Sequence, residues 1–341
     1  MADQVFPTEP VATAPQPAWR TTLNSVVNFI LKQREASILV IAIALIAYFQ
    51  ASNSAFLSSA NIPVISQYTA ATAIIAAGEV MLLICGEIDL SVGNAFALAP
   101  FIMYFANQAG VPLFLGIILG LITCAAIGLI NGLVTVFLRV PSFITTLGTL
   151  FMLNGITLVI SNAFPVLPPD ENTPFSQAFG QGPYSEIEWA IAIVIVMQII
   201  LYFTPWGLHT VATGGNPLGA SEVGINISRI KIVNFMMCSV FGGFAGILEG
   251  FRINTISPLS GGTDIMFAAV AGSVIGGTAL NGGSGTVIGA FLGVFVISLL
   301  KDGFTLVGVN AYYFNLILGA AILIAMILNV RLQVLRKAGR E

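Results

Sequence analysis

Long apolar runs, interrupted by short polar turns, fill the chain from about residue 36 to residue 330. Several stretches contain no charged residue at all: 36–78, 90–138, 140–169, 265–300 and 303–330. A membrane helix needs about 20 predominantly apolar residues, and most of these stretches are long enough for one or two crossings. The pattern therefore predicts an all-α polytopic membrane protein.

The polar turns divide the apolar region into about ten predicted membrane helices. They lie near residues 37–57, 62–85, 92–107, 111–138, 141–162, 188–206, 230–251, 264–281, 285–301 and 310–330. Residues 36–331 are therefore one transmembrane domain, and residues 332–341 form a short tail. In residues 1–35, an apolar face that includes Val26 and Ile30 indicates an interfacial helix. An unstructured lead-in to the first span is the alternative.

Composition supports the same class. Only 8% of the residues are charged and 57% are hydrophobic, whereas a soluble domain carries roughly 25% charged residues. The chain has one histidine, His209, and no metal-binding spacing of the H-E-x-x-H type. We therefore expect neither an enzyme nor a chain that binds a metal ion or a cofactor. No basic patch with interleaved aromatic residues indicates a nucleic-acid partner.

Basic residues set the expected orientation. Of the 12 lysines and arginines, only Arg252 and Lys301 fall on the side opposite the chain ends in a ten-helix arrangement. Because loops rich in Lys and Arg stay in the cytoplasm, both termini are predicted to be cytoplasmic. The loop 163–187 carries acidic residues and no base, and it is predicted to face outward.

Glycines four residues apart recur along the spans, as at Gly116 and Gly120 and at Gly285 and Gly289. In lipid, such small residues let helices approach closely. The sequence shows no strong internal repeat, and only the span count favours an inverted arrangement of five plus five helices. The segment 277–284, GTALNGGS, lacks the lysine of a phosphate-binding loop. We therefore predict a tight turn between packed helices there.

The segment 86–93, GEIDLSVG, places two carboxylates directly after an apolar run. A charged side chain near the bilayer centre costs about 2.5–3.5 kcal/mol, so the helix is expected to stop near the first glycine of this segment. Asp89 and Ser91 are suited to cap a new helix that starts at Leu90 or Val92. One interpretation places this break at membrane depth, where it is tolerated only if protein or a water-filled cavity surrounds it. A turn at the cytoplasmic surface is the alternative.

The loop 207–229 contains several glycines, an Asn-Pro turn and a short helical stretch. Connections between packed helices usually have about 2–8 residues, so its length favours a docking element for a cytoplasmic partner. A plain connecting loop is the alternative.

Four segments, in order, resemble one family. They are GEIDLSVG at 86–93, ATGGNPLGASEVGINISRIKI at 212–232, AAVAGSVIGGTALNGGSGTVIGAFLG at 268–293 and DGFTLVGVNAYYFNLILGAAILIA at 302–325. These segments are similar to motifs of the permease subunits of ribose-type ABC importers. The resemblance runs from about residue 37 to the C-terminus.

The resemblance implies the permease subunit of a binding-protein-dependent importer in the cytoplasmic (inner) membrane, which translocates a monosaccharide or similar small polar solute. It implies three partners: a second permease copy or homologue, a cytoplasmic ATPase that binds ATP and Mg²⁺, and an external solute-binding protein. The residues that match the family's coupling motif are Gly214, Gly215, Asn216, Gly224 and Ile225.

This sequence departs from the family pattern in two places. Pro217, Leu218 and Gly219 stand where relatives often have Glu-Ala-Ala, so an ionic contact to the ATPase is missing or moved to Glu222. Glu87 stands where relatives commonly have glycine, and we expect it to add a carboxylate near the translocation pathway and to alter ligand choice.

We predict a weakly selective pathway lined by polar groups. Its candidates are Glu87, Asp89, Ser91, Asn94, Asn131, Thr145, Thr146, Asn154 and Asn234. Interhelical hydrogen bonds are the alternative role for the neutral members of this set. The alternative function is an ion-coupled secondary carrier for a small polar solute, with Glu79, Glu87 and Asp89 as coupling sites.

Overall fold

The computed structural model describes residues 34–169 and 173–310, together with residues 313, 314, 316, 317, 319, 320, 323, 324 and 327. The predicted interfacial helix, the tail 332–341 and much of the tenth predicted span lie outside the described residues. Apart from its turns, the described part is helical, with one isolated bridge between Val166 and Ile256.

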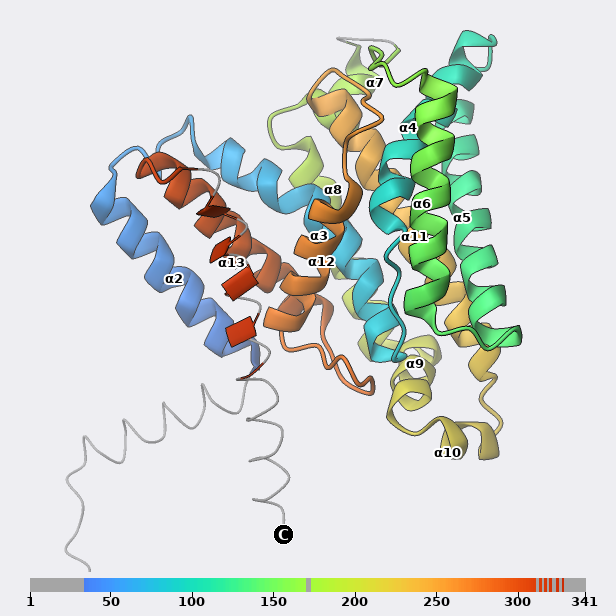
Figure 1. The fold of residues 1–341 in the computed structure, drawn as a ribbon. Coiled ribbons are helices and arrows are strands. Elements are labelled where there is room, and N and C mark those ends of the chain that lie inside the picture. Colours follow the sequence, from blue (N-terminus) through green and yellow to red (C-terminus); the bar gives the residue numbers. More distant parts are fainter. Residues whose placement is uncertain are drawn as a thin grey trace, which may run out of the picture.

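Nine of the predicted spans each correspond to a described long helix (Figure 1), with ends that differ by up to six residues: the helix predicted over 264–281 ends at Ile275, and the one predicted over 37–57 ends at Ser52. The long helices are α2 (Arg34–Ser52), α3 (Ile62–Ile84), α4 (Val92–Gln108), α5 (Leu113–Phe137), α6 (Ser142–Ser161), α8 (Ser185–Phe203), α11 (Ile227–Arg252), α12 (Gly262–Ile275) and α13 (Val287–Leu306). The short ones are α7 (Pro174–Ser176), the π-helical turn η1 (Gln177–Gln181), α9 (Pro205–Gly215) and α10 (Pro217–Glu222). Seven of the described helices, all of the long ones except α4 and α12, are long and apolar enough to cross a membrane.

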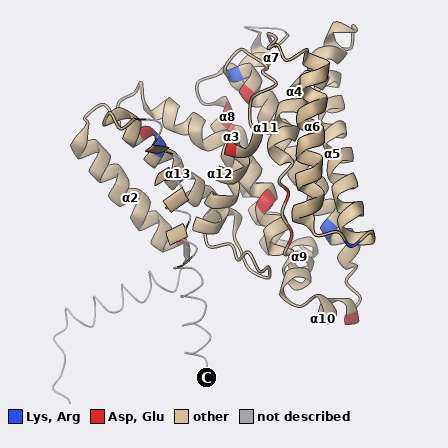
Figure 2. Ribbon diagram, viewed as in Figure 1, with Lys and Arg blue, Asp and Glu red and all other residues tan. Residues whose placement is uncertain are grey.

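Helix α3 forms the centre of the molecule. It packs against α8, α11, α12 and α13, and nearly all of its residues from Thr69 onward are buried. The peripheral helices α2, α5, α6 and α8 instead turn large apolar side chains outward, for example Phe151, Val159 and Phe203. Charged residues are sparse along α2, α5 and α6 (Figure 2). Such an apolar exterior suits lipid rather than water, so the protein is a polytopic membrane protein.

Helices α4 and α12 are short because each begins inside the molecule. We call the end that carries α9 and α10 the lower end, as in Figure 1. The chain before α4 rises extended from the lower end, and the chain before α12 descends from the upper end (Figure 1). The two helix starts meet where a Cβ on Gly93 would collide with the carbonyl oxygen of Gly262. Only glycine allows this close crossing.

A short sequence motif is repeated at the two helix starts that form this crossing. Leu90-Ser91 and Leu259-Ser260 precede the two helix starts in an L-S-x-G pattern, and the two copies lie 169 residues apart. The glycine pairs Gly116–Gly120 and Gly285–Gly289 have the same separation. The contacts are repeated as well: α4 packs on α5 as α12 packs on α13, and α5 packs on α11 as α13 packs on α3.

The predicted turn over 277–284 is confirmed. Residues 276–286 connect α12 to α13 at the lower end (Figure 1). Gly282 and Gly283 have φ values of +81° and +78°, a conformation that favours glycine. The backbone N–H of Gly283 donates to the carbonyl of Ile84 at the end of α3, at 2.8 Å.

Candidate functional site

The break in the segment 86–93 lies between α3 and α4. Helix α3 ends at Ile84, Gly86 follows with φ +77°, and α4 begins at Val92. The predicted stop and the predicted start at Val92 are confirmed. The predicted capping role of Ser91 is wrong: it occupies the N-cap position, but its hydroxyl makes no capping hydrogen bond and donates to Asp89 instead.

A buried polar cluster holds this break. Asp89 Oδ1 accepts from the Ser91 backbone N–H at 2.8 Å and from its hydroxyl at 2.5 Å. Asp89 Oδ2 accepts from the Ser239 hydroxyl at 3.1 Å. The Asn131 amide donates to the Ser91 hydroxyl at 2.9 Å, and Thr149 donates to Asn131 Oδ1 at 2.6 Å. Because nearly every polar atom has a partner, the carboxylate is tolerated in the interior.

Glu87 lies at the lower end rather than in this cluster. Its carboxylate forms an ion pair with Lys231 of α11 at 2.5 Å. The two residues line a groove of about 810 Å³ together with Arg139 and Ser221. Within this one segment, Glu87 therefore borders a groove at the lower end, whereas Asp89 is fully buried.

Most of the remaining predicted pathway residues make interhelical or local hydrogen bonds. The Asn94 amide donates to the Leu150 carbonyl at 2.7 Å, and the Thr146 hydroxyl donates to the Ser142 carbonyl at 2.8 Å. Asn234 accepts from the Trp206 indole at 3.0 Å and links α11 to α9. These bonds fit the alternative role for those residues. Thr145 and Asn154 lie half-buried on α6. The pathway role of the whole set stays a prediction.

The predicted coupling residues lie on a pair of short helices at the lower end. Gly214 and Gly215 end α9, and Asn216 caps α10 by accepting from the Gly219 backbone N–H at 3.0 Å. Gly224 follows α10 with φ +87° and an open space around it, and the Ile225 N–H donates to the Ala220 carbonyl. The loop is thus a helical element, which the sequence predicted only in part.

Gly214 joins this element to the membrane helices. A Cβ at Gly214 would collide with the carbonyl oxygen of Ile84 and approach the backbone of Gly283 to 2.8 Å. The side chains of Leu218 and Val223, on and after α10, are exposed. A partner that binds α10 would therefore lie close to the C-terminal end of α3 and to Gly283 in the 276–286 turn.

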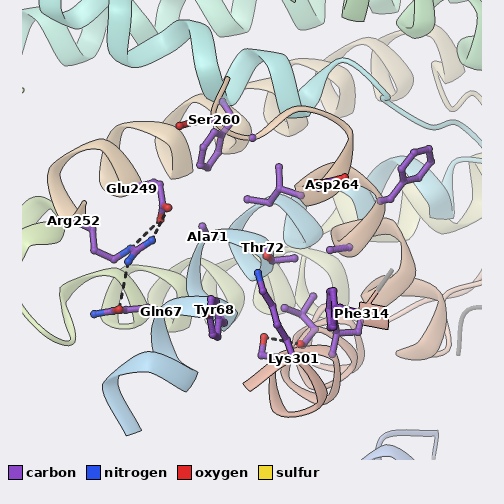
Figure 3. A pocket seen from close by; sticks show the side chains of 18 of the residues that line it. Gln67, Tyr68, Ala71, Thr72, Glu249, Arg252, Ser260, Asp264, Lys301 and Phe314 are labelled. Carbon is purple, nitrogen blue, oxygen red and sulfur yellow. Dashed lines mark hydrogen bonds and ion pairs between the residues drawn. The ribbon is translucent and has the colours of Figure 1, made fainter. Parts of the chain in front are cut away.

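A cavity of about 560 Å³ opens in the upper half, between α3, α11, α12 and α13 (Figure 3). Its charged and polar lining residues are Gln67, Thr72, Glu249, Arg252, Ser260, Asp264, Ser298 and Lys301, and its aromatic ones are Tyr68, Phe96, Phe267 and Phe314. We call it the upper cavity. Two of its lining residues, Phe96 and Gly261, lie beside the crossing of α4 and α12.

Arg252 is the most heavily bonded group of the upper cavity. It donates to the Glu249 carboxylate at 2.9 and 2.5 Å and to Gln67 Oε1 at 3.3 Å. It also forms an ion pair with buried Glu186 of α8 at 3.1 Å. Lys301 instead places its ammonium over the ring of Tyr68, 4.4 Å from the centroid.

The sequence alone did not predict this cavity, although two of its lining residues stood out in the charge pattern. Arg252 and Lys301 were the two exceptions to the predicted charge asymmetry. Charges inside membrane helices are rare and usually functional. The described residues contain no group of three or more His, Cys, Asp or Glu side chains that could hold a metal ion.

An apolar exterior, a buried polar break and polar hollows at both ends are features typical of membrane transport proteins. Residues 61–326 match the family model described as "branched-chain amino acid transport system / permease component". The chain belongs to this family, which confirms the resemblance to importer permeases.

Curated relatives cover most of the chain. It is 39% identical over 311 residues to the xylose/arabinose import permease protein XylH of Sulfolobus acidocaldarius, over 88% of this chain and 86% of the relative. It is 34% identical to the ribose import permease protein RbsC of Bacillus subtilis, over 81% of this chain and 87% of the relative. It is 30% identical to the autoinducer 2 import system permease protein LsrC of Photorhabdus laumondii, over 90% and 92%. No solved structure matches the chain.

Proposed function

We propose that this chain is the membrane-spanning permease subunit of an ATP-binding-cassette importer for a monosaccharide or a similar small polar solute. The observation that carries the proposal is its family membership together with relatives named as import permeases for xylose and arabinose and for ribose. The upper cavity supports a polar solute, because it combines polar side chains with aromatic walls.

The proposed architecture has ten membrane helices, cytoplasmic termini and two inverted halves of five helices each. The L-S-x-G pair and the opposite directions of α4 and α12 support the inverted halves. The start of α2 lies at the lower end with α9 and α10, which supports a cytoplasmic N-terminus (Figure 1). Arg139, Arg229 and Lys231 flank the lower ends of α5 and α11, as the preference for cytoplasmic basic residues requires.

The proposed partners follow from this orientation. The lower end faces the cytoplasm, and an ATPase that binds ATP and Mg²⁺ docks on α9 and α10. The upper end faces outward in the cytoplasmic membrane and receives solute from an external binding protein. A second permease copy or homologue completes the pathway. The exposed side chain of Leu218 and the contact of Gly214 with α3 support the docking site.

An ion-coupled carrier remains the second candidate because of one buried carboxylate. Glu79 in α3 is fully buried, and its Oε2 has no hydrogen-bond partner among the described residues. Buried carboxylates of this kind serve as proton or cation sites in secondary carriers. An ATPase-driven importer has no need of such a site.

Uptake by membrane vesicles separates the two candidates. Vesicles that contain the chain, an ATPase partner and the binding protein should accumulate radiolabelled sugar when ATP is supplied to the cytoplasmic face. An ionophore that collapses ion gradients should leave this uptake intact, and removal of the ATPase should abolish it. Uptake that persists without the ATPase and collapses with the ionophore would establish the carrier instead.

A further inference from the structure

The upper cavity has the size and the surface of a ligand site. Its volume of about 560 Å³ lies within the roughly 300–1,000 Å³ of small-molecule pockets. Its wall combines the aromatic side chains of Tyr68, Phe96 and Phe314 with polar groups; Tyr68 and Phe314 lie close to Lys301 (Figure 3). A small solute with both hydroxyl groups and C–H faces would find matching surface there.

Two of its charged groups are available to a ligand. Asp264, at the start of α12, makes no hydrogen bond or ion pair with a described residue, and Lys301 makes no ion pair with one. Lys301 rests instead on the aromatic rings of Tyr68 and Phe314, at 4.4 and 5.8 Å from their centroids. Arg252 and Glu249 are already bound to each other. Asp264 offers only acceptor sites and Lys301 only donors.

The charge balance of the lining limits the ligand. It contains two acids, Glu249 and Asp264, and two bases, Arg252 and Lys301. A neutral polyhydroxy compound can donate hydroxyl protons to Asp264 and accept from Lys301 without changing this balance. A sugar acid or sugar phosphate could pair with Lys301 but would leave Asp264 facing a second anion. The cavity therefore favours a neutral ligand.

We propose that the upper cavity is a binding station within the permease for a neutral monosaccharide or polyol, which Asp264 and Lys301 hold by its hydroxyl groups. This inference rests on the proposed function and adds a site to it. The station lies between the upper opening and the crossing of α4 and α12, whose glycines close the way beyond Phe96. Solute released at the upper end would bind here before the crossing opens.

The first test uses the complete transporter in proteoliposomes, with its ATPase and binding protein, and D-xylose and D-ribose as probes. Asp264→Asn and Lys301→Met should each lower sugar uptake about tenfold, the cost of one hydrogen bond to a charged group. ATP hydrolysis stimulated by the binding protein should persist, because neither residue lies near α9 or α10. Glu188→Gln is the matched control, since Glu188 is exposed in the first turn of α8 and does not line the cavity.

A second measurement does not depend on these variants. Ser260 lines the cavity and is partly exposed, and the three native cysteines are buried. In a Ser260→Cys protein, millimolar D-xylose should slow labelling by a maleimide severalfold. D-glucuronate at the same concentration should protect much less.

The outcomes are distinct. If wild-type proteoliposomes show no ATP-dependent uptake, the proposed function itself fails. If wild-type uptake is ATP-dependent but both cavity variants transport normally, the binding station is overturned and the proposed function stands. Equal labelling of the Ser260→Cys protein with and without D-xylose would overturn the station as well.

Discussion

Asp89 is the residue on which the break between α3 and α4 depends. Its two carboxylate oxygens receive hydrogen bonds from the Ser91 backbone, the Ser91 hydroxyl and the Ser239 hydroxyl. These donors come from the break itself and from α11, so one side chain joins a non-helical segment to a long helix. The carboxylate is fully buried, and any donor left without it stays away from water.

Asp89→Ala should therefore be much more harmful than Asn154→Ala. Each buried donor that loses its acceptor costs about 1–3 kcal/mol, whereas Asn154 is only half-buried on α6. We expect Asp89→Ala to lower the thermal midpoint of the purified protein by several degrees and to abolish uptake. Asn154→Ala should leave both nearly unchanged. Equal and mild effects of the two substitutions would contradict the structural role of Asp89.

Glu87 is expected to affect stability rather than ligand choice. Its carboxylate pairs with Lys231 at the lower end, with side-chain exposures of 12% and 21%, and both residues line the lower groove rather than the upper cavity. Partly exposed ion pairs contribute at most about 1 kcal/mol, and salt screens them. Glu87→Gly should lower the thermal midpoint slightly at low salt and leave the ranking of sugars in competition uptake unchanged. A changed ranking would place Glu87 in the pathway after all.

At the scale of elements, the crossing of α4 and α12 is a close backbone contact beside the upper cavity. Gly93 at the start of α4 faces the backbone of Gly262 at the start of α12. Because α4 and α12 touch at their first residues, small rotations can separate them, whereas helices that pack along their whole length would have to slide. Gly261, next to this contact, lines the upper cavity, so the crossing borders that cavity.

Gly93→Ala should disrupt this crossing. An added Cβ would collide with the Gly262 carbonyl, so α4 and α12 must move apart or the protein must fail to fold. We expect a loss of uptake greater than tenfold, or a loss of folded protein in detergent gel filtration. Gly148→Ala in α6 is the control, since a Cβ there meets nothing within 4 Å. Normal uptake by the Gly93→Ala protein would show that the crossing is not tight.

Gly224 sets the path of the chain after α10. Its φ of +87° costs a residue with a side chain about 1–2 kcal/mol, although the surrounding space is open. Gly224→Val should therefore reorient α10, uncouple ATP hydrolysis from uptake and leave membrane insertion intact. Gly110→Val is the matched control, with φ +88° and equally open space at the upper end. Coupled uptake in the Gly224→Val protein would argue against docking at α10.

The sequence predicted the helices well because each apolar run is long and ends at polar or glycine-rich turns. The position of the break was also predictable, since Asp89 cannot continue a lipid-facing helix. The hydrogen bonds of Asn94, Asn131 and Asn234 were not predictable. The sequence does not distinguish an amide that faces a pathway from one that bonds to a neighbouring helix. The upper cavity is lined by residues of α3, α11, α12 and α13, which are far apart in the sequence, so no single motif predicts it.

At the scale of the whole molecule, the upper cavity and the lower groove lie at opposite ends of the described structure. The Asp89 carboxylate is fully buried, and the glycine crossing is a close backbone contact beside the upper cavity. An ATPase shifts such a structure between outward and inward states only if it binds the two with different affinity. The α9–α10 element is suited to transmit ATPase binding to the membrane helices, because Gly214 touches the end of α3.

The most direct test of the central claim is sugar uptake by proteoliposomes of defined composition. The purified chain is reconstituted with its ATPase, the binding protein is supplied outside, and ATP is trapped on the α9–α10 side. Labelled sugar should accumulate above the external concentration only when ATP, ATPase and binding protein are all present. Accumulation without ATP, driven by an imposed proton or sodium gradient, would contradict the account.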